Sequence, residues 1–546
     1  MDLSELKQQY KDSVPCRTSC PADTDIPGYL EAIYNNDYEK AYDINFNDNF
    51  FPEILGRVCS RPCEKSCRHG MDENGDSVSI CFSKRASGKY KYHGNIKLKN
   101  TLPRTHKHIL VIGGGVAGLA AAAELKRCGH DVTIYERHSS LGGMLNQGIP
   151  VFRLPRKIIA KEIKQITDLG IKVELNKNIS SNREIEKLSR EFDAVVCAMG
   201  TLKPNYLDKS FKENKHVEDG LDFLMRVNEK SDKRVGKNVV IIGGGYTSMD
   251  CARTALRLGA KTVKTFYRRE QGDLDILPGE LEELINEKGN MIFRARPNKL
   301  IERNGKLNFL ELIKTRIDNK GILKDIRGSN FKIKTDHIIL AIGQKQEFKN
   351  RNKLKNVFFA GDYKLGATTL INAIGDAKKV AYQIDKFLMK RDLSREEFIR
   401  KNNTKTKRSL NLNYVPLTEM RLKDIGQRTF KAEVELGFSK SESKKESSRC
   451  YLCHYQFEIN NDLCVLCDEC LLVKPVDGCI KEVSSKSVKE SGEVVLKNIE
   501  PGKSHGIYHG LLYIDPKKCV RCGECEKACP TGAIKLSKLS KINASA

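Results

Sequence analysis

The pattern of apolar and polar positions repeats one supersecondary unit twice along the chain. Residues 108–136, HILVIGGGVAGLAAAAELKRCGHDVTIYE, run from an apolar stretch through three glycines into an alanine-rich stretch and a second apolar run. Residues 238–270, NVVIIGGGYTSMDCARTALRLGAKTVKTFYRRE, follow the same order. A strand, a glycine turn, a helix and a second strand form a βαβ unit with parallel strands. The pattern therefore predicts an α/β fold with two Rossmann-like domains.

The glycines of the first unit are spaced as in a dinucleotide-binding turn. Gly113, Gly115 and Gly118 fit G-x-G-x-x-G, in which the glycines allow a tight turn, close backbone approach to a pyrophosphate, and close packing of helix on strand. Glu136 ends the second strand about 20 residues later, where a carboxylate binds a ribose hydroxyl. The first unit is therefore predicted to bind a dinucleotide.

The second unit departs from the first at two places. Gly243 and Gly245 repeat the pattern, but Ser248 replaces the third glycine. At the end of its second strand, Arg268 and Arg269 stand where the first unit has an acid, and guanidinium groups suit a 2′-phosphate. This site is therefore predicted to bind NADPH, with NADH as the alternative if the neighbouring Glu270 faces the ribose instead.

A late segment returns the chain to the first unit. Residues 356–381, NVFFAGDYKLGATTLINAIGDAKKVA, supply a further strand and helix. One dinucleotide fold inserted into another is typical of a flavoprotein that takes hydride from a nicotinamide. The chemistry then belongs to the flavin, and no side chain is predicted to act as an acid, a base or a nucleophile.

Length and charge add limits to this picture. A chain of 546 residues exceeds one hydrophobic core and predicts three or four domains. No apolar run reaches the length of a membrane span, and the N-terminus has no signal-peptide pattern, so we expect a soluble, cytoplasmic protein without a transmembrane segment. The net charge of +25 is spread along the chain without a nucleic-acid-binding motif, which indicates a solvated basic surface and no nucleic-acid partner.

The nineteen cysteines concentrate at the two ends of the chain. Short C-x-x-C and C-x-x-x-C spacings without a secretion signal indicate metal ligands rather than disulfides. Cys128, Cys197 and Cys251 lie between the two groups and are predicted to be buried core thiols. Six cysteines lie near the N-terminus, on either side of a segment that reads as helical hairpins: Cys16, Cys20, Cys59, Cys63, Cys67 and Cys81. Their number and dispersal favour an iron–sulfur cluster over zinc.

The C-terminal cysteines resemble a two-cluster ferredoxin with one ligand missing. The second run is intact, with Cys519, Cys522, Cys525 and Cys529 before Pro530. In such ferredoxins the fourth cysteine of each run binds the other cluster, so Cys529 is predicted to complete the cluster of the first run. The ligands of that first run are Cys464, Cys467 and Cys470.

Lys474 occupies the position of the fourth cysteine in the first run. A protonated lysine has no lone pair to donate, so the cluster of the second run needs another ligand. Cys479 is the preferred substitute, because the PVDG segment before it can form a turn. Cys450 or Cys453, an open or three-iron cluster, or one cluster with a structural zinc are the alternatives.

Several motifs together resemble the small subunit of NADPH-dependent glutamate synthase and its relatives. They are LGGMLNQGIPVFRLPRKII at 141–159, YRR at 267–269, AIGQ at 341–344 and AGD at 360–362. The resemblance implies FAD at the first unit, with Gly143 and Asp362 as further contacts, and NADPH at the second. Relatives with two N-terminal clusters carry an extra C-x-x-C before the position of Cys16, which this chain lacks. One N-terminal [4Fe–4S] cluster is therefore expected, held by Cys20, Cys59 and Cys63 with Cys67 or Cys81, and two are expected in the C-terminal domain.

These observations combine into one predicted architecture and function. We expect an all-α iron–sulfur domain at 1–100, an FAD domain at 101–232 and 331–400, an NAD(P)H domain at 233–330, a linker at 401–448, and an α+β ferredoxin domain at 449–546. The predicted function is electron transfer between NAD(P)H, FAD, the clusters and a partner protein. By analogy that partner is a ferredoxin, a 2-oxoacid oxidoreductase or another reductase subunit in a hetero-oligomer. A non-catalytic assembly or regulatory subunit, and the glutamate synthase small subunit itself, are the alternatives.

Overall fold

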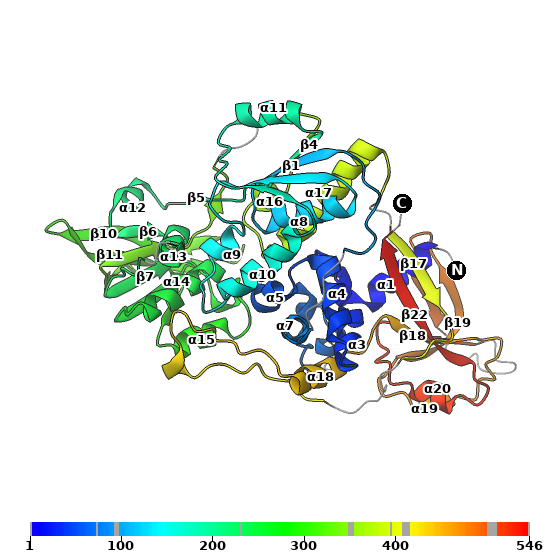
Figure 1. Ribbon diagram of the computed structural model, residues 1–546. Coiled ribbons are helices and arrows are strands. Elements are labelled where there is room, and N and C mark those ends of the chain that lie inside the picture. The colour runs from blue at the N-terminus through cyan, green and yellow to red at the C-terminus, as the bar shows by residue number, and fades with distance from the viewer. Residues whose placement is uncertain are drawn as a thin grey trace.

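Two α/β parts, a helical part and a β-rich part make up the structure, a computed structural model (Figure 1). It describes residues 3–71, 75–91, 98–229, 232–347, 354–393, 396–406, 415–498 and 510–543. The helical part lies between the α/β parts and the β-rich part, and the latter holds both ends of the chain. Within the described ranges, no helix has the length and apolar character needed to cross a membrane.

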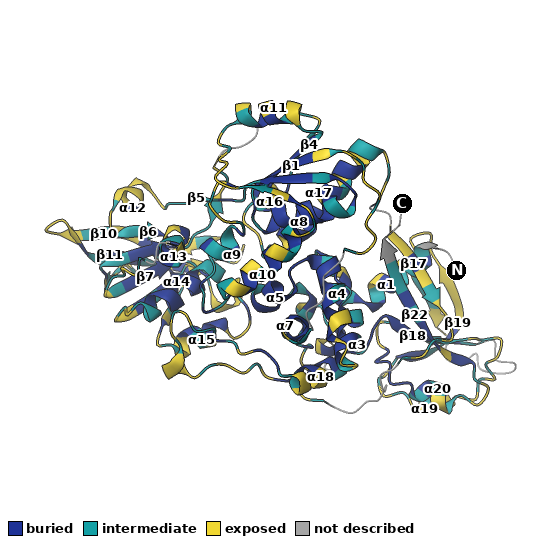
Figure 2. Ribbon diagram, viewed as in Figure 1, coloured by how far each residue is buried: buried dark blue, intermediate teal, exposed yellow. Residues whose placement is uncertain are grey.

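The first α/β part is a five-stranded parallel sheet in the order β16-β4-β1-β2-β3. Its strands are β1 (His108–Ile112), β2 (Asp131–Tyr135), β3 (Lys172–Glu174), β4 (Ala194–Cys197) and β16 (Val357–Phe359). Its helices are α8 (Val116–Arg127), α9 (Met144–Gln147), α10 (Arg156–Thr167), α11 (Asn182–Glu191), α16 (Asp362–Leu365) and α17 (Leu370–Met389). The central strands are almost wholly buried (Figure 2), as expected of a parallel sheet covered by helices. The first βαβ unit and the return of the late segment are confirmed.

The second α/β part is inserted between β4 and β16. Its parallel sheet has the order β6-β14-β7-β8-β9, with strands β6 (Val217–Asp219), β7 (Asn238–Ile242), β8 (Thr262–Tyr267), β9 (Asn290–Phe293) and β14 (His337–Leu340). Its helices are α12 (Lys209–Glu213), α13 (Gly220–Glu229), α14 (Tyr246–Arg257) and α15 (Glu280–Asn286). An antiparallel sheet extends it, made of β10 (Ala295–Arg303), β11 (Lys306–Ile317), β12 (Leu323–Asp325) and β13 (Phe331–Lys334).

Strand pairing moves the expected domain boundaries. β6 and β14 both belong to the second sheet, whereas boundaries of 233 and 330 leave them in the first domain. The two crossings between the parts lie side by side, because β5 (Lys203–Pro204) pairs with β15 (Gln344–Lys345). The sequence prediction missed this because β6 is only three residues long and lies before the glycine turn that marked the second unit.

The N-terminal helices form the predicted hairpins. They are α2 (Pro15–Thr18), α3 (Ile26–Tyr34), α4 (Tyr38–Asn49), α5 (Pro52–Val58), α6 (Pro62–Lys65) and α7 (Ile80–Tyr90). Asp25 and Asp37 accept backbone N–H hydrogen bonds at the starts of α3 and α4, which satisfies groups that a helix leaves unpaired. Tyr29, Phe46 and Phe50 are fully buried among these helices, so the segment has a core of its own.

The β-rich part contains two three-stranded sheets and joins both ends of the chain. One sheet pairs β17 (Glu396–Lys401), β22 (Ile534–Asn543) and β18 (Tyr455–Ile459). The other pairs β20 (Val494–Asn498), β19 (Ile480–Val488) and β21 (Leu511–Ile514), and α19 (Glu469–Leu472) and α20 (Glu524–Ala528) complete the part. Helix α1 (Leu3–Ser13) packs on β17 and β22. The expected boundary at 400 is therefore also wrong, because β17 belongs to the ferredoxin part.

Most of the expected linker at 401–448 has a defined place. Residues 440–448 form a helix, α18 (Lys440–Ser448), which packs against α3 and α7. A capping box between Ser439 and Glu442 starts it, and Glu446 is buried with an ion pair to Arg449. The basic, serine-rich composition concealed this S-x-x-E signal. Residues 407–414 of the expected linker lie outside the described residues.

Candidate functional site

A large cavity opens at the first glycine turn and has a volume of about 630 Å³, within the range of small-molecule sites. Gly113 has φ +105°, and a Cβ atom on Gly118 would lie 1.9 Å from the Gly113 carbonyl oxygen. Both positions therefore require glycine. Gly115 is different, because a Cβ atom there would meet nothing within 4 Å of the chain. Its surface belongs to the cavity, at the N-terminus of α8, where backbone N–H groups favour a phosphate.

Three further predicted residues line the same cavity. Glu136 accepts hydrogen bonds from the N–H groups of Gly114 at 2.7 Å and His138 at 2.9 Å, which fix its carboxylate beside the turn. Gly143 lies against the turn, since a Cβ atom on it would be 3.2 Å from the Gly115 Cα. Asp362 accepts a hydrogen bond from the Thr368 hydroxyl at 2.6 Å, and burial raises its pKa. The structure thus brings these residues to one place.

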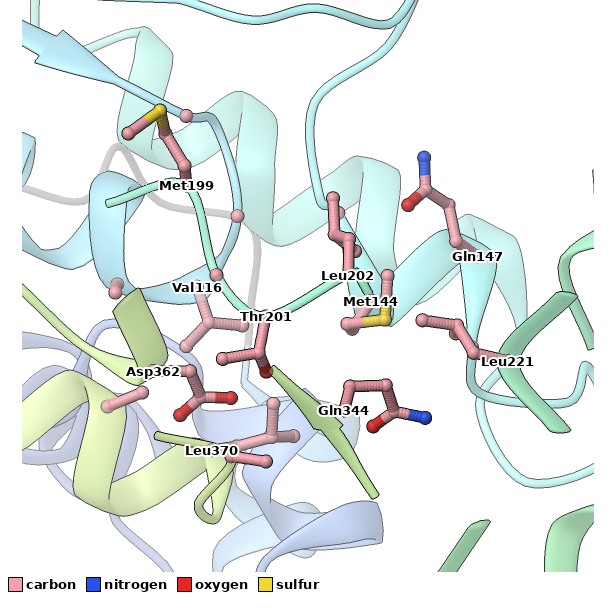
Figure 3. A pocket seen from close by; sticks show the side chains of 18 of the residues that line it. Val116, Met144, Gln147, Met199, Thr201, Leu202, Leu221, Gln344, Asp362 and Leu370 are labelled. Carbon is pink, nitrogen blue, oxygen red and sulfur yellow. The ribbon is translucent and has the colours of Figure 1, made fainter. Parts of the chain in front are cut away.

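Side chains around the cavity divide into two groups (Figure 3). Val116, Thr201 and Asp362 gather in one region, and Met144, Leu202 and Leu221 gather in another. Leu221 belongs to α13, so the second α/β part contributes directly to the wall. The cavity therefore lies between the two nucleotide folds.

The second glycine turn reaches the cavity from the other side. Gly245, Tyr246 and Thr247 line it at the N-terminus of α14. Gly243 does not line the cavity, but its φ of +149° forms the turn. Ser248 is buried, and its hydroxyl donates to the Gly245 carbonyl at 2.6 Å, so a small polar residue fills the place of the third glycine.

Arg268 and Arg269 lie at the end of β8, away from the cavity wall. Arg268 is exposed and Arg269 is partly exposed. Glu270 forms an ion pair with Arg294 at 2.6 Å. The NADH alternative depends on the Glu270 carboxylate, which is engaged by this ion pair. Arg268 and Arg269 directly follow the end of the strand.

Arg153 joins the two nucleotide folds at the cavity and was not predicted. It lies in the first fold, lines the cavity, and forms ion pairs with Asp250 at 2.8 Å and Glu280 at 2.6 Å in the second. Burial lowers the pKa of Arg153, but the charges of these two carboxylates outweigh burial and raise it above the usual value. In the sequence, the position of Arg153 within the RLPR motif could have indicated its role.

Four N-terminal thiols gather beside the cavity. We call Cys20, Cys59, Cys63 and Cys81 the proximal thiols. Val58 and Ser60 line the cavity on either side of Cys59 in the sequence. Cys81 hydrogen-bonds with both Cys59 and Cys63, and the charge of Cys20 also acts on Cys63. Of the two alternatives for the fourth ligand, the structure places Cys81 in this group.

Lys84 lies within reach of the proximal thiols. It is 2% exposed. Burial lowers the pKa of Lys84, but the charges of Cys81, Cys59, Cys20 and Cys63 outweigh burial and raise it above its usual value. A buried ammonium beside four thiols suits a negatively charged cluster.

Cys67 lies in another group. Charges on Cys453, Cys67 and Cys450 contribute, after burial, to raising the pKa of Cys16 well above its usual value. We call Cys16, Cys67, Cys450 and Cys453 the bridging thiols, because they come from both ends of the chain. From the sequence, Cys67 was an alternative fourth ligand of the N-terminal cluster and Cys16 had no assigned role. Cys450 and Cys453 were alternatives for the ligand missing at Lys474, with a further cluster or a capping role also open.

The C-terminal thiols form two groups that follow the predicted exchange of ligands. The inner lobe thiols, Cys479, Cys519, Cys522 and Cys525, line one small pocket together with Lys474. The predicted turn before Cys479 is present, with the Cys479 N–H donating to the Val476 carbonyl at 3.2 Å and Gly478 at φ +69°. The outer lobe thiols are Cys464, Cys467, Cys470 and Cys529, and the charges of the other three act on Cys470.

The residues present fit iron–sulfur clusters by donor chemistry, since thiolates are the ligands that such clusters prefer. Over the described residues, no three or more His, Cys, Asp or Glu side chains are arranged to hold a single metal ion. The assignment of clusters therefore depends on the grouping of the thiols and on the domain families below.

Three family models match the chain. Residues 107–377 match a pyridine nucleotide-disulphide oxidoreductase model, residues 10–93 match dihydropyrimidine dehydrogenase domain II with a 4Fe-4S cluster, and residues 512–535 match a 4Fe-4S binding domain. The first match spans both glycine turns, the second spans the proximal thiols, and the third contains the intact cysteine run. These matches confirm the predicted combination of domains.

Curated relatives match large parts of the chain. The NADP(+)-dependent formate dehydrogenase subunit beta of Moorella thermoacetica is 29% identical over 69% of this chain and 61% of its own length. The NADPH-Fe(3+) oxidoreductase subunit beta of Geobacter sulfurreducens is 28% identical over 81% of this chain and 75% of its own. The glutamate synthase [NADPH] small chain of Azospirillum brasilense is 28% identical over 67% and 84%. The chain thus spans less than two thirds of the first of these relatives.

Proposed function

Because this chain belongs to the pyridine nucleotide oxidoreductases that combine FAD and NADPH folds with 4Fe-4S domains, we propose that it passes electrons between NADPH and a partner protein. The nucleotide cavity would hold FAD and NADPH, where electrons would enter or leave, and the thiol groups would hold the clusters that relay them. The relatives named as subunits support a role inside a hetero-oligomer.

One observation carries this proposal: a single cavity is lined by both glycine turns and by the two residues that flank Cys59. Gly115 of the first turn, Gly245 of the second turn and Ser60, which follows Cys59, all line this cavity. Tyr246, beside Gly245, lies close enough to Cys59 for that thiol's charge to add to the burial and carboxylate charges that raise the tyrosine's pKa to about 12. A hydride donor, a flavin and a cluster can therefore meet without any large movement of the chain.

The chain's own residues bind, orient and exclude water. The N-termini of α8 and α14 supply N–H groups for the phosphates of two dinucleotides. The Arg153 ion pairs hold the two turns at a fixed separation across the cavity. FAD, when bound, supplies the chemistry that converts hydride transfer into single-electron transfer. Orientation by both folds is the part of catalysis that the protein contributes.

The outer lobe thiols are the proposed point of exchange with the partner. Cys467 is exposed. Large apolar side chains close to it in the sequence are exposed, namely Leu463 (53%), Val465 (64%), Leu472 (78%) and Val473 (38%). Clustered exposed apolar residues mark contact sites for other proteins. A partner that docks here reaches the cluster farthest from the nucleotide cavity.

The experiment is an anaerobic titration of the purified protein with NADPH and with NADH. We expect NADPH to bleach the flavin band and then the iron–sulfur absorption. Replacing both strand-end arginines, Arg268→Ser with Arg269→Ser, should raise the KM for NADPH about 10- to 100-fold, because each lost charge-assisted hydrogen bond weakens binding, and should leave the KM for NADH nearly unchanged.

The matched control is Arg296→Ser, which removes a partly exposed arginine of the same α/β part that pairs with Asp325. This variant should change neither the KM for NADPH nor the KM for NADH. Protein that takes up no flavin, or flavin that NADPH leaves oxidised, would contradict the proposal and favour a non-catalytic subunit.

A further inference from the structure

The loop between Cys450 and Cys453 has the same backbone turn as the cluster loops of the ferredoxin lobe. The residue before the second cysteine has positive φ in this loop and in the first C-x-x-C of each ferredoxin run: +51° at Leu452, +52° at Leu466 and +58° at Arg521. Non-glycine residues rarely adopt this conformation, which costs roughly 1–2 kcal/mol. Three repeats at one position therefore indicate a shared structural role.

A hydrogen bond to sulfur accompanies the turn. The Leu452 N–H donates to the Cys450 sulfur at 3.4 Å. The same arrangement occurs in the proximal loop, where Arg61 has φ +56° and its N–H donates to the Cys59 sulfur at 3.5 Å. N–H groups aimed at sulfur stabilise a thiolate bound to iron and tune the potential of a cluster.

The other two bridging thiols lie in a comparable setting. Burial raises the pKa of the Cys67 thiol, and hydrogen bonds from the backbone N–H groups of Val78 and His69 partly offset that rise. Cys16 is 8% exposed, on α2, which packs against α6 of the proximal loop. Cys16 is therefore buried and Cys67 half-buried, with the proximal thiols as neighbours along the chain.

Contacts around the bridging thiols hold the two ends of the chain together. Arg449 donates to the Ser77 carbonyl at 3.1 Å, and the Tyr451 ring lies 4.9 Å from the His69 ring. On the far side, Tyr455 donates to the Glu31 carboxylate at 3.1 Å. The Cys450–Cys453 loop is thus held against the N-terminal helices by direct contacts on both of its sides.

Two buried arginines beside this group lack a carboxylate partner. Arg68 is 7% exposed and Arg521 is 1% exposed, and neither forms an ion pair with a carboxylate of the described residues. Arg521 donates to backbone carbonyls, among them those of Tyr455 at 3.0 Å and Pro516 at 2.9 Å. Arg68 approaches the Cys453 sulfur at 4.0 Å. Buried cations require a compensating negative charge, and a cluster with four thiolates supplies one.

We propose that the bridging thiols hold a further [4Fe–4S] cluster, formed only when the C-terminal C-x-x-C docks on the N-terminal helices. Its position is between the proximal thiols and the inner lobe thiols, because Arg68 also donates to the Cys519 carbonyl at 3.0 Å. A cluster held by these four thiolates would relay one electron at a time between its two neighbours, so no proton or further reactant would be needed. The site itself does not depend on the proposed function; only the direction of electron flow does.

The test is the iron and acid-labile sulfide content of the full chain, purified without oxygen. With four clusters we expect about 16 iron atoms per chain, and about 12 in the Cys450→Ser, Cys453→Ser double variant. One paramagnetic signal of the reduced protein should disappear. The matched control, Cys128→Ser, changes a buried thiol far from the four groups in the sequence and should keep all the iron.

A variant that simply misfolds is recognised by its flavin content, which should stay at the wild-type ratio. A Cys16→Ser variant should lose the same signal as the double variant, because one cluster shares both ends. Wild-type protein with about 12 iron atoms, or variants with unchanged iron and spectra, would overturn the proposal. Failure of the proposed function appears differently, as flavin that NADPH does not reduce.

Discussion

Replacing Gly115 by alanine separates binding of the flavin from stability of the fold. Gly115 has φ −75° and ψ −174°, which any residue adopts, and an added Cβ atom meets nothing of the chain within 4 Å. The apoprotein should therefore unfold at the wild-type temperature or slightly higher, since alanine restricts the unfolded chain and gains about 0.4–1 kcal/mol. The new methyl group occupies the cavity surface at the start of α8, where the pyrophosphate is expected.

Overpacking of a fitted site costs about 1–3 kcal/mol, which corresponds to a loss of FAD affinity of about 10- to 100-fold. Gly118→Ala provides the contrast. Its Cβ atom would lie 1.9 Å from the Gly113 oxygen, where ordinary contacts begin at 3.4 Å, so α8 has to retreat by about 1.5 Å. This variant should lose both flavin and thermal stability.

The assay combines titration of flavin-free protein with FAD, followed by flavin fluorescence, and thermal unfolding of the same preparation. The expected result is weak binding with unchanged stability for Gly115→Ala and loss of both for Gly118→Ala. Wild-type FAD affinity in Gly115→Ala would refute the assignment of this cavity to the pyrophosphate. Equal destabilisation of the two variants would refute the inference that a methyl group at position 115 meets no other part of the chain.

Two further predictions concern the ferredoxin lobe and the second nucleotide fold. Cys479→Ser should remove about four iron atoms and one paramagnetic signal, because only three inner lobe thiols then remain. Unchanged iron content would show that Cys479 does not supply the ligand that is missing at Lys474. In Glu287, burial raises the pKa, but hydrogen bonds from Arg257 and Arg253 outweigh it and lower the pKa to about 2. A lowered pKa stabilises the fold above about pH 4.5, by about 2–3 kcal/mol, and this stabilisation is lost as the pH falls towards 2. Glu287→Gln should therefore lower the unfolding temperature at pH 7, with a difference from wild type that shrinks in acid; a constant difference would contradict the assignment.

The nucleotide folds were predictable because their signals are local. Gly113 and Gly118 are required by a positive φ and by a close approach within one turn, and both features follow from six residues of sequence. Glu136 follows from the length of one helix and one strand. The boundary of the second fold was not predictable in the same way, because β6 and β14 join its sheet through crossovers that short strands do not announce.

The partners of the cysteines were only partly predictable. The replacement of the ligand at Lys474 by Cys479 was open to inference, because five residues and one turn connect the two positions. The grouping of Cys67 with Cys453 was not, because Arg68, next to Cys67, and Cys453 are 385 positions apart and nothing in the sequence indicates their contact. The turn at Leu452 was a usable signal, since C-x-x-C occurs there as in the two ferredoxin runs.

Docking of the two chain ends turns four separate thiol groups into one ordered series. The N-terminal helix α1 packs on the C-terminal sheet, with the Tyr10 and Phe398 rings 5.4 Å apart and Gln9 donating to Gln456 at 2.6 Å. The lobe is therefore held against the helices that carry the proximal thiols. Because Arg68 contacts both Cys453 and the Cys519 loop, the order from the cavity is proximal, bridging, inner and outer. A lobe attached only by a flexible linker would need a collision for each electron, whereas this arrangement keeps every transfer within one folded chain.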